Sequence, residues 1–193
     1  MKLYDAILKY KPYNEQEEKD KNLILNCLKN EKDIFTRDNS LCHLTSSCWI
    51  VNKERTKILL CFHNIYNSWT WLGGHADGIE DLLEVAIKEA KEESGLTYIR
   101  PLNNGDIFSL ESLSVDGHIK RGEYVSTHIH LNVTYLLEAD SLEELKIKED
   151  ENKNLGWFDF DDILILSKEP WFIKHIYPKL NNKLRNYIEK EQK

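Results

Sequence analysis

Three glutamates on one predicted helix form the part of the sequence best suited to chemistry. Glu89, Glu92 and Glu93 stand at i, i+3 and i+4 in the segment 80–94, which has helical periodicity. At 100° per residue they share a sector of about 100° at the border of the apolar face. Carboxylates this close repel one another, more strongly near a protein core. A divalent cation would reverse the sign of that interaction, and oxygen ligands alone select Mg²⁺, Mn²⁺ or Ca²⁺ rather than Zn²⁺.

Glycines bracket this predicted helix. Four of the eight glycines in the chain fall between residues 73 and 95. Gly73, Gly74 and Gly78 belong to a glycine-rich loop before the helix, and Gly95 is placed as a helix stop. A glutamate cluster alone is more often a solvated helix face. The glycine-rich loop, the bordering apolar arc and the glycine stop occur together here, which favours a metal site.

At these residues the sequence resembles the Nudix hydrolase family, whose signature is G-x5-E-x7-R-E-U-x-E-E-x-G-U, with U a bulky aliphatic residue. Seven of the nine fixed positions match in register across 23 residues, namely Gly74, Glu80, Glu89, Glu92, Glu93, Gly95 and Leu96. Lys88 stands where the family has Arg, and Ala90 where it usually has a larger aliphatic residue. Lys keeps the charge but loses the bidentate geometry of the Arg fork, so this departure could weaken activity.

The resemblance implies Mg²⁺-dependent hydrolysis, with Mn²⁺ as a substitute ion. The substrate would be a nucleoside diphosphate linked to another moiety, or a related organic pyrophosphate, attacked by a metal-activated water. Carried over by position, Glu92 and Glu93 would be the main metal ligands. The backbone carbonyl of Gly73 would be a further ligand, and Glu89 would bind a second metal ion or orient water.

The resemblance gives other residues supporting roles. Glu80 would brace the junction between loop and helix, through Lys88, and Gly95 would end the helix. Many family members carry a further Glu on a later loop as base or ligand, and Glu151 stands at the expected place. A solvated acidic loop is an equally good interpretation of Glu151. The general base therefore stays open between Glu89, Glu93 and Glu151.

Residues just before the predicted helix are candidates for substrate binding, namely Gly74, His75 and Trp71. His75 follows the double glycine and fits either a substrate contact or loop packing. Trp71 alternates with Trp69, so one face of that short strand could flank a ligand, although tryptophans more often pack in a core.

Histidines and cysteines elsewhere give weaker signals. His128 and His130 lie two apart and so share one face of a strand. No third metal ligand is evident for them in the sequence, which favours a cavity wall or a surface pair. The four cysteines lack zinc-type spacing and are interpreted as reduced, mostly buried thiols.

The element pattern predicts an α+β fold, a Nudix-like α/β/α sandwich with a mixed sheet and helical extensions at both ends. Hairpins rather than repeated βαβ units favour the mixed sheet. Helices are expected at 14–29, 80–94, 161–166 and from Pro170 with a restart at Pro178, and strands at 44–51, 57–62, 107–115, 124–137 and 157–160. The predicted organisation is an N-terminal extension (1–40), a Nudix hydrolase domain (41–166) and a C-terminal extension (167–193).

Composition excludes several other classes. The net charge is -7, which argues against a nucleic acid polymer as partner. No apolar run approaches the roughly 20 residues of a membrane helix. The N-terminal sequence lacks a signal-peptide pattern, so a cytoplasmic protein is expected. The end helices could cap the pocket or build a homodimer.

Two other functions stay open. An isopentenyl-diphosphate isomerase-like enzyme on the same fold would want a catalytic Cys and dedicated metal-binding histidines, and the scattered cysteines neither support nor exclude it. A non-catalytic module that binds a nucleotide or metabolite would often have lost glutamates of the signature, all of which are kept here. The sequence does not indicate the physiological substrate.

Overall fold

The computed structural model describes residues 2–120 and 122–192, which divide into two compact units of discontinuous sequence. The first unit comprises Met1–Ser47, Gly73–Ala86 and Ile107–Tyr135, and the second comprises Cys48–Leu72, Ile87–Asp106 and Leu136–Lys193. Four elements contribute residues to both units: β1 (Cys42–Asn52), β4 (Leu72–His75), α3 (Leu82–Ser94) and β9 (His128–Ala139). Helices and strands are interspersed along the chain, as the α+β prediction requires.

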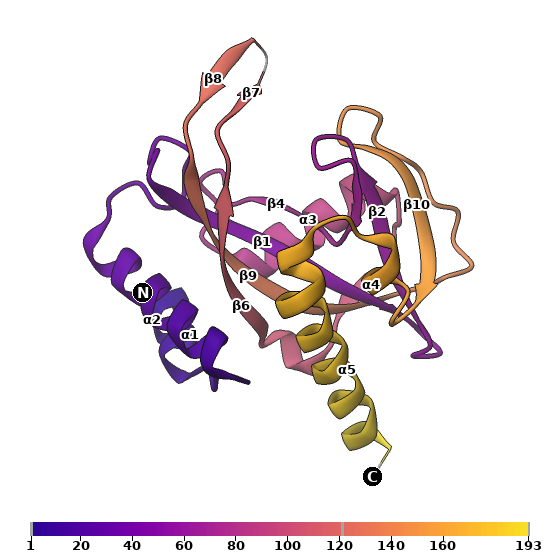
Figure 1. Ribbon diagram of the computed structural model, residues 1–193. Coiled ribbons are helices and arrows are strands. Elements are labelled where there is room, and N and C mark those ends of the chain that lie inside the picture. Colours follow the sequence, from indigo (N-terminus) through magenta and orange to yellow (C-terminus); the bar gives the residue numbers. More distant parts are fainter. Residues whose placement is uncertain (1, 121, 193) are drawn as a thin grey trace. The chain divides into compact units, whose positions relative to one another are not determined.

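Two helices begin the first unit. Helix α1 (Lys2–Lys9) contacts α2 (Glu15–Asn30), and the two are seen side by side in Figure 1. The start of α2 is where the sequence predicts it, because the Asn14 side chain accepts a hydrogen bond from the backbone N–H of Glu17 at 3.0 Å. Helix α2 then contacts strand β6 (Ile107–Val115).

The strands of the first unit include a long antiparallel pair. Strand β6 pairs with β9, and in the segment that connects them the short strands β7 (His118–Lys120) and β8 (Glu123–Val125) pair with each other and extend beyond the long pair (Figure 1). The single strand predicted over 124–137 is therefore two strands. The interruption falls at residues 126–127, which belong to neither strand. There the hydroxyl of Thr127 accepts a hydrogen bond from the backbone N–H of Gly117.

Antiparallel pairs also build the sheet of the second unit. Strand β2 (Lys57–His63) pairs with β1, with β3 (Ser68–Thr70) and with β10 (Asn152–Asp159), while β5 (Ile99–Pro101) pairs with β9. The predicted hairpin between β1 and β2 is confirmed. Its turn is held by the Asn52 side chain, which accepts from the backbone N–H groups of Thr56 and Lys57 at 2.8 Å each.

Helical segments close the second unit. Helix α4 (Ile163–Leu166) precedes a π-helical turn, η2 (Phe172–Ile176), and then α5 (Tyr177–Glu191), in which Pro178 occupies the first turn. The restart at Pro178 is confirmed, since proline suits a helix start and not an interior. No helix in the described part of the chain is both long and apolar enough to span a bilayer.

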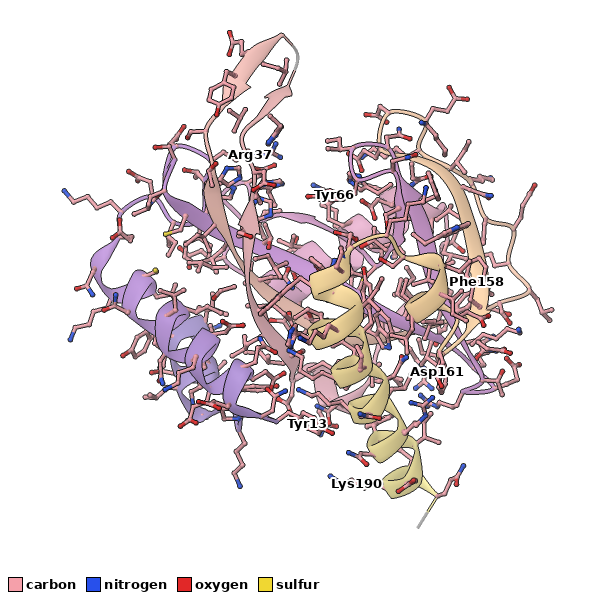
Figure 2. The ribbon with its side chains drawn as sticks, viewed as in Figure 1. Tyr13, Arg37, Tyr66, Phe158, Asp161 and Lys190 are labelled. Carbon is pink, nitrogen blue, oxygen red and sulfur yellow. The ribbon has the colours of Figure 1, made fainter. Side chains whose placement is uncertain are left out.

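Aromatic side chains form much of the core of the second unit. Trp49 is fully buried and stacks with Tyr177, with ring centroids 5.9 Å apart. Trp71 is also buried and meets Phe172 edge-on at 5.6 Å. Phe158, labelled in Figure 2, meets the ring of Trp69 edge-on at 4.7 Å. Trp71 therefore contributes to the core, the more usual of its two predicted roles.

Candidate functional site

Three carboxylates of the second unit converge on one place. Glu89, Glu93 and Glu151 each offer one oxygen, and these oxygens lie within 4.8 Å of one another. Glu93 is buried, with 4% of its surface exposed, and the other two are half-buried. We call these three residues the acidic cluster. Such a set of oxygen donors suits a hard divalent cation.

Hydrogen bonds to two backbone carbonyls hold the segments of the acidic cluster in place. Glu89 and Glu93 lie on the last turns of α3, while Glu151 directly precedes β10. The Asn152 side chain donates a hydrogen bond to the carbonyl of Glu93 at 2.9 Å, and the carbonyl of Glu151 accepts from the N–H of Asn64 at 3.0 Å. The loop that carries Glu151 is thus bonded to the end of the helix and to the segment after β2.

Gly95 ends helix α3 in the way the sequence predicts. Its φ of 72° is left-handed, and its N–H donates to the carbonyl of Lys91 at 2.8 Å. A Cβ at this position would lie 2.6 Å from the Cβ of Lys146. Glycine is therefore required both by the backbone conformation and by the close approach of the segment around Lys146, whose N–H donates to the carbonyl of Ser94 at 2.8 Å.

Lysines neutralise part of the negative charge. Lys148 Nζ lies 2.9 Å from Glu151 Oε1 and 3.4 Å from Glu92 Oε2. Lys88 Nζ lies 3.7 Å from Glu89 Oε1 and 3.8 Å from Glu92 Oε1. The side chain of Glu92 is 42% exposed and lies between these two ammonium groups. Glu92 is thus adjacent to the acidic cluster and linked to it through Lys148.

The proton affinities follow from burial and from these neighbours. Burial raises the pKa of Glu89, the charges of Glu92 and Glu151 raise it further, and Lys88 and Lys148 oppose the rise. Burial alone would lower the pKa of Lys148, but its hydrogen bonds with Glu151 and Glu92 and their charges raise it to about 12. Without a metal ion, the acidic cluster relies on ammonium groups for its compensating charge.

Other residues predicted for the site belong to the first unit. Gly73 lies in β4 (Leu72–His75), where a Cβ would come within 2.5 Å of the Ser46 carbonyl oxygen, so only glycine allows this approach to β1. Gly74 follows it in β4, and Glu80 is exposed in the loop before α3. The ring of His75 lies against another histidine, His130, with Nε2 to Nε2 at 3.2 Å.

The sequence pattern did not predict the positions of two residues, Lys148 beside the acidic cluster and His43 beside His75 and His130. Lys148 was not considered, although it stands three residues before Glu151, a spacing that allows an ion pair within one turn. His43 was given no role, because a single histidine at the start of a strand carries no pattern by itself.

A trio of carboxylates at the end of a glycine-stopped helix suits an enzyme that uses a divalent cation to act on a phosphorus-containing anhydride. The NUDIX domain family model matches residues 43–180. The chain therefore belongs to the NUDIX family, and this confirms the resemblance found in the sequence and the predicted enzyme class, a pyrophosphohydrolase.

Solved structures give the same fold. A NUDIX-family hydrolase from Clostridium perfringens is 23% identical, with 75% of this chain and 97% of that chain covered and a TM-score of 0.53. An Ap4A hydrolase from C. elegans is 19% identical (76% and 98% covered, TM-score 0.52). A MutT protein from Methanosarcina mazei Go1 is 17% identical (80% and 99% covered, TM-score 0.51). These likenesses confirm the predicted fold class, whereas no curated protein matches the chain significantly.

Proposed function

We propose that this protein hydrolyses the pyrophosphate bond of a nucleoside diphosphate linked to another moiety, or of a related organic pyrophosphate, with Mg²⁺ as its ion and Mn²⁺ as a substitute. The observation that carries the proposal is the convergence of Glu89, Glu93 and Glu151 within 4.8 Å. A diphosphate carries negative charge, and an acidic site can accept it only if a cation lies between the two.

The donor set fits a magnesium-type ion. All three groups are carboxylates, and they come from a helix end and a loop that are bonded to each other. When bound, the ion would neutralise phosphate charge and lower the pKa of a coordinated water. Glu93, the most buried of the three, would hold the ion, and Glu92 is proposed as a further ligand from the family signature. Glu89 and Glu151 would hold and orient the attacking water, and either could accept its proton.

Lysine side chains would help to bind the phosphate groups of the substrate. Lys148 and Lys88 now pair with carboxylates. An ion in the acidic cluster would compete for those carboxylates, which leaves the ammonium groups available to phosphate oxygens. The carbonyl of Gly73 as a metal ligand, and the contacts of Gly74 and His75 with substrate, remain predictions from the family signature.

An isomerase function is the less favoured alternative. That chemistry would want a reactive cysteine, and burial raises the pKa of both Cys48 and Cys61 well above the ordinary thiol value. Burial, together with neighbouring Cys27, raises the pKa of Cys42 to about 12. These thiols are buried and form no disulfide, which agrees with the interpretation from sequence.

The test is a substrate screen with the full chain. Dinucleoside polyphosphates, nucleotide sugars, ADP-ribose and (d)NTPs are incubated with Mg²⁺ or Mn²⁺, and released phosphate is measured after phosphatase coupling. We expect turnover of at least one class that stops when the ion is chelated. Metal binding without turnover of any class would instead support a non-catalytic module, and a double-bond shift in isopentenyl diphosphate would support the isomerase.

A further inference from the structure

Four histidines of the first unit meet in a second cluster. His43 comes from β1, His75 from the end of β4, and His128 and His130 from β9. One ring nitrogen each of His43, His128 and His130 lies within 4.8 Å of the others. The Nε2 atom of His130 is 3.1 Å from Nε2 of His128 and 3.2 Å from Nε2 of His75. We call these four residues the histidine cluster.

The strands hold the histidine cluster through their backbones. The carbonyl of Leu44, next to His43, accepts from the N–H of Ala76, the residue after His75, at 3.0 Å. The carbonyl of Leu41 accepts at 3.0 Å from the N–H of Ile129. The three segments that carry the rings are therefore fixed to one another before any ligand arrives, which is the preorganisation a ligand site needs.

The hydrogen bonds of two rings use Nδ1 and leave Nε2 as the ligand atom. His43 Nδ1 lies 3.1 Å from the carbonyl of Asn39, and His128 Nδ1 lies 2.8 Å from the carbonyl of Ser126. A carbonyl only accepts, so both Nδ1 atoms carry a proton, and in the neutral form of each ring Nε2 is the atom with the lone pair. A histidine that ligates a metal through Nε2 is commonly held by this same Nδ1–H to carbonyl bond.

His43 is the member of the histidine cluster that most strongly indicates a ligand site. It is 5% exposed, and its Nε2 atom is buried with no hydrogen-bond partner among residues 2–120 and 122–192. A buried, unsatisfied acceptor costs on the order of 1–3 kcal/mol, so a native protein that keeps one usually has a use for it. The rings of His75, His128 and His130 have their centroids 4.9–5.1 Å from that of His43.

We propose that His43, His75, His128 and His130 bind one divalent transition-metal ion of the zinc type. Imidazole nitrogen is a preferred ligand of zinc and its neighbours in the first transition series, and is a poor match for Mg²⁺. Four nitrogens about 2.0–2.1 Å from a tetrahedral zinc ion lie about 3.3 Å from one another. The two measured Nε2 to Nε2 distances, 3.1 and 3.2 Å, are close to that spacing.

The electrostatics favour the ligand form of the rings. Burial lowers the pKa of His43 and of His130, and the neighbouring histidines and Arg37 lower that of His130 further. Neutral imidazole is the form that binds metal. Arg37, labelled in Figure 2, is held by a bidentate pair with Asp77 at 2.8 and 2.6 Å. A metal with four protein ligands would act structurally, joining β1, β4 and β9.

The experiment is a zinc titration of the metal-stripped full chain by calorimetry, in excess Mg²⁺ so that hard-ion sites are filled. We expect one Zn²⁺ per chain, with a Kd of about 1 μM or tighter. The double variant His43→Asn/His130→Asn should weaken binding at least about 100-fold, since the loss of mere outer-shell partners already costs 10–100-fold. Co²⁺ added to the parent protein should give the visible absorption of a tetrahedral nitrogen site.

Two controls separate this site from other zinc binding. His175→Asn removes a half-buried histidine of the second unit, packed on Trp171, and should leave the titration unchanged. Glu93→Gln should also leave it unchanged, so failure of the acidic cluster and failure of the histidine cluster are distinguishable. The proposal is overturned if the parent protein binds no zinc in the micromolar range, or if the double variant binds it as the parent does. If the double variant does not fold, a Co²⁺ spectrum without tetrahedral bands in the parent is enough to overturn it.

Discussion

The acidic cluster of the second unit and the histidine cluster of the first are both groups of side chains that could hold a metal ion, but they are built in opposite ways. The carboxylates come from successive turns of one helix and a nearby loop, and lysine ammonium groups lie within 2.9–3.8 Å of them or of Glu92. The imidazoles come from three strands, and burial lowers the pKa of two of them, His43 and His130.

This difference concerns the state without metal. The carboxylates next to the lysines already have ion-pair partners, so an incoming ion must displace those partners. Such a site suits an ion that binds and leaves with substrate, as Mg²⁺ does. In the histidine cluster, Nε2 of His43 has no partner in the described part of the chain, so an ion displaces nothing from it. Such a site suits an ion that stays bound.

The largest effect on hydrolysis is expected when the acidic cluster, the proposed catalytic site, loses a carboxylate. Glu93→Gln keeps the shape of the side chain and removes its charge, so Mg²⁺-dependent hydrolysis should fall at least about 1000-fold. We expect the same for Glu92→Gln from the family signature. Steady-state kinetics with the best substrate of the screen measures both, with circular dichroism to check the fold.

A matched control lies on the same helix. Glu84 is exposed on α3 and outside the acidic cluster, so Glu84→Gln should leave turnover unchanged. Turnover retained in both the Glu92 and Glu93 variants would contradict the assignment of the acidic cluster as the catalytic site.

A carboxyl group elsewhere in the second unit tests how far a carboxylate in the protein interior depends on compensating charge. Glu169 is half-buried, and its buried Oε2 atom has no hydrogen-bond partner within the part of the chain that the structure describes. Burial raises its pKa to about 7 from 4.5, although a hydrogen bond with Tyr177 opposes the rise. The folded protein thus holds this proton more tightly than the unfolded chain, and stability falls as pH rises between these two values.

Glu169→Gln should remove that loss. At about pH 8 the variant should be more stable than the parent by about 1–3 kcal/mol, and the difference should disappear below about pH 4.5, where both chains are neutral at this position. Urea unfolding at several pH values measures it. A difference that is constant with pH would show that Glu169 does not titrate in this range.

Much of this could be predicted from sequence, because the determining signals are local. Such signals act within a few residues of the chain, as do the capping residue Asn14, the turn around Asn52 and the stop at Gly95. The helices and the hairpin that begin or end at these residues are confirmed. The spacing of Glu89 and Glu93 likewise depends only on helix geometry. The gathering of Glu151 with them was predicted from the family, since the loop that places it is distant in the sequence.

The histidine cluster shows where such reasoning fails. His128 and His130 were seen as a pair without a third ligand, because the third and fourth come from strands more than 50 residues away. Only the pairing of strands brings His43 and His75 to them. Long-range ladders carry no signature in a single sequence, so a site built across strands is hidden in a way that a site on one helix is not.

A smaller effect is expected at the loop member of the acidic cluster. Glu151 is half-buried and already paired with Lys148 at 2.9 Å, so it holds the ion or the water less tightly than Glu93 does. Glu151→Gln should lower kcat about 10-fold, with a smaller change in KM. Unchanged kinetics would remove Glu151 from the catalytic side of the comparison, and a loss as large as that of Glu93→Gln would make it an equal ligand.

The smallest effect is expected at Lys88, where the family signature has arginine. Its single ammonium group lies 3.7 Å from Glu89 and 3.8 Å from Glu92, beyond good hydrogen-bond distance from either. An arginine fork could bond both carboxylates at once and orient them for the ion, so Lys88→Arg should raise kcat/KM about 2- to 5-fold. Zinc affinity should not change, because the histidine cluster contains no residue of this helix. A lower kcat/KM would mean that the compact ammonium group is itself adapted to this site.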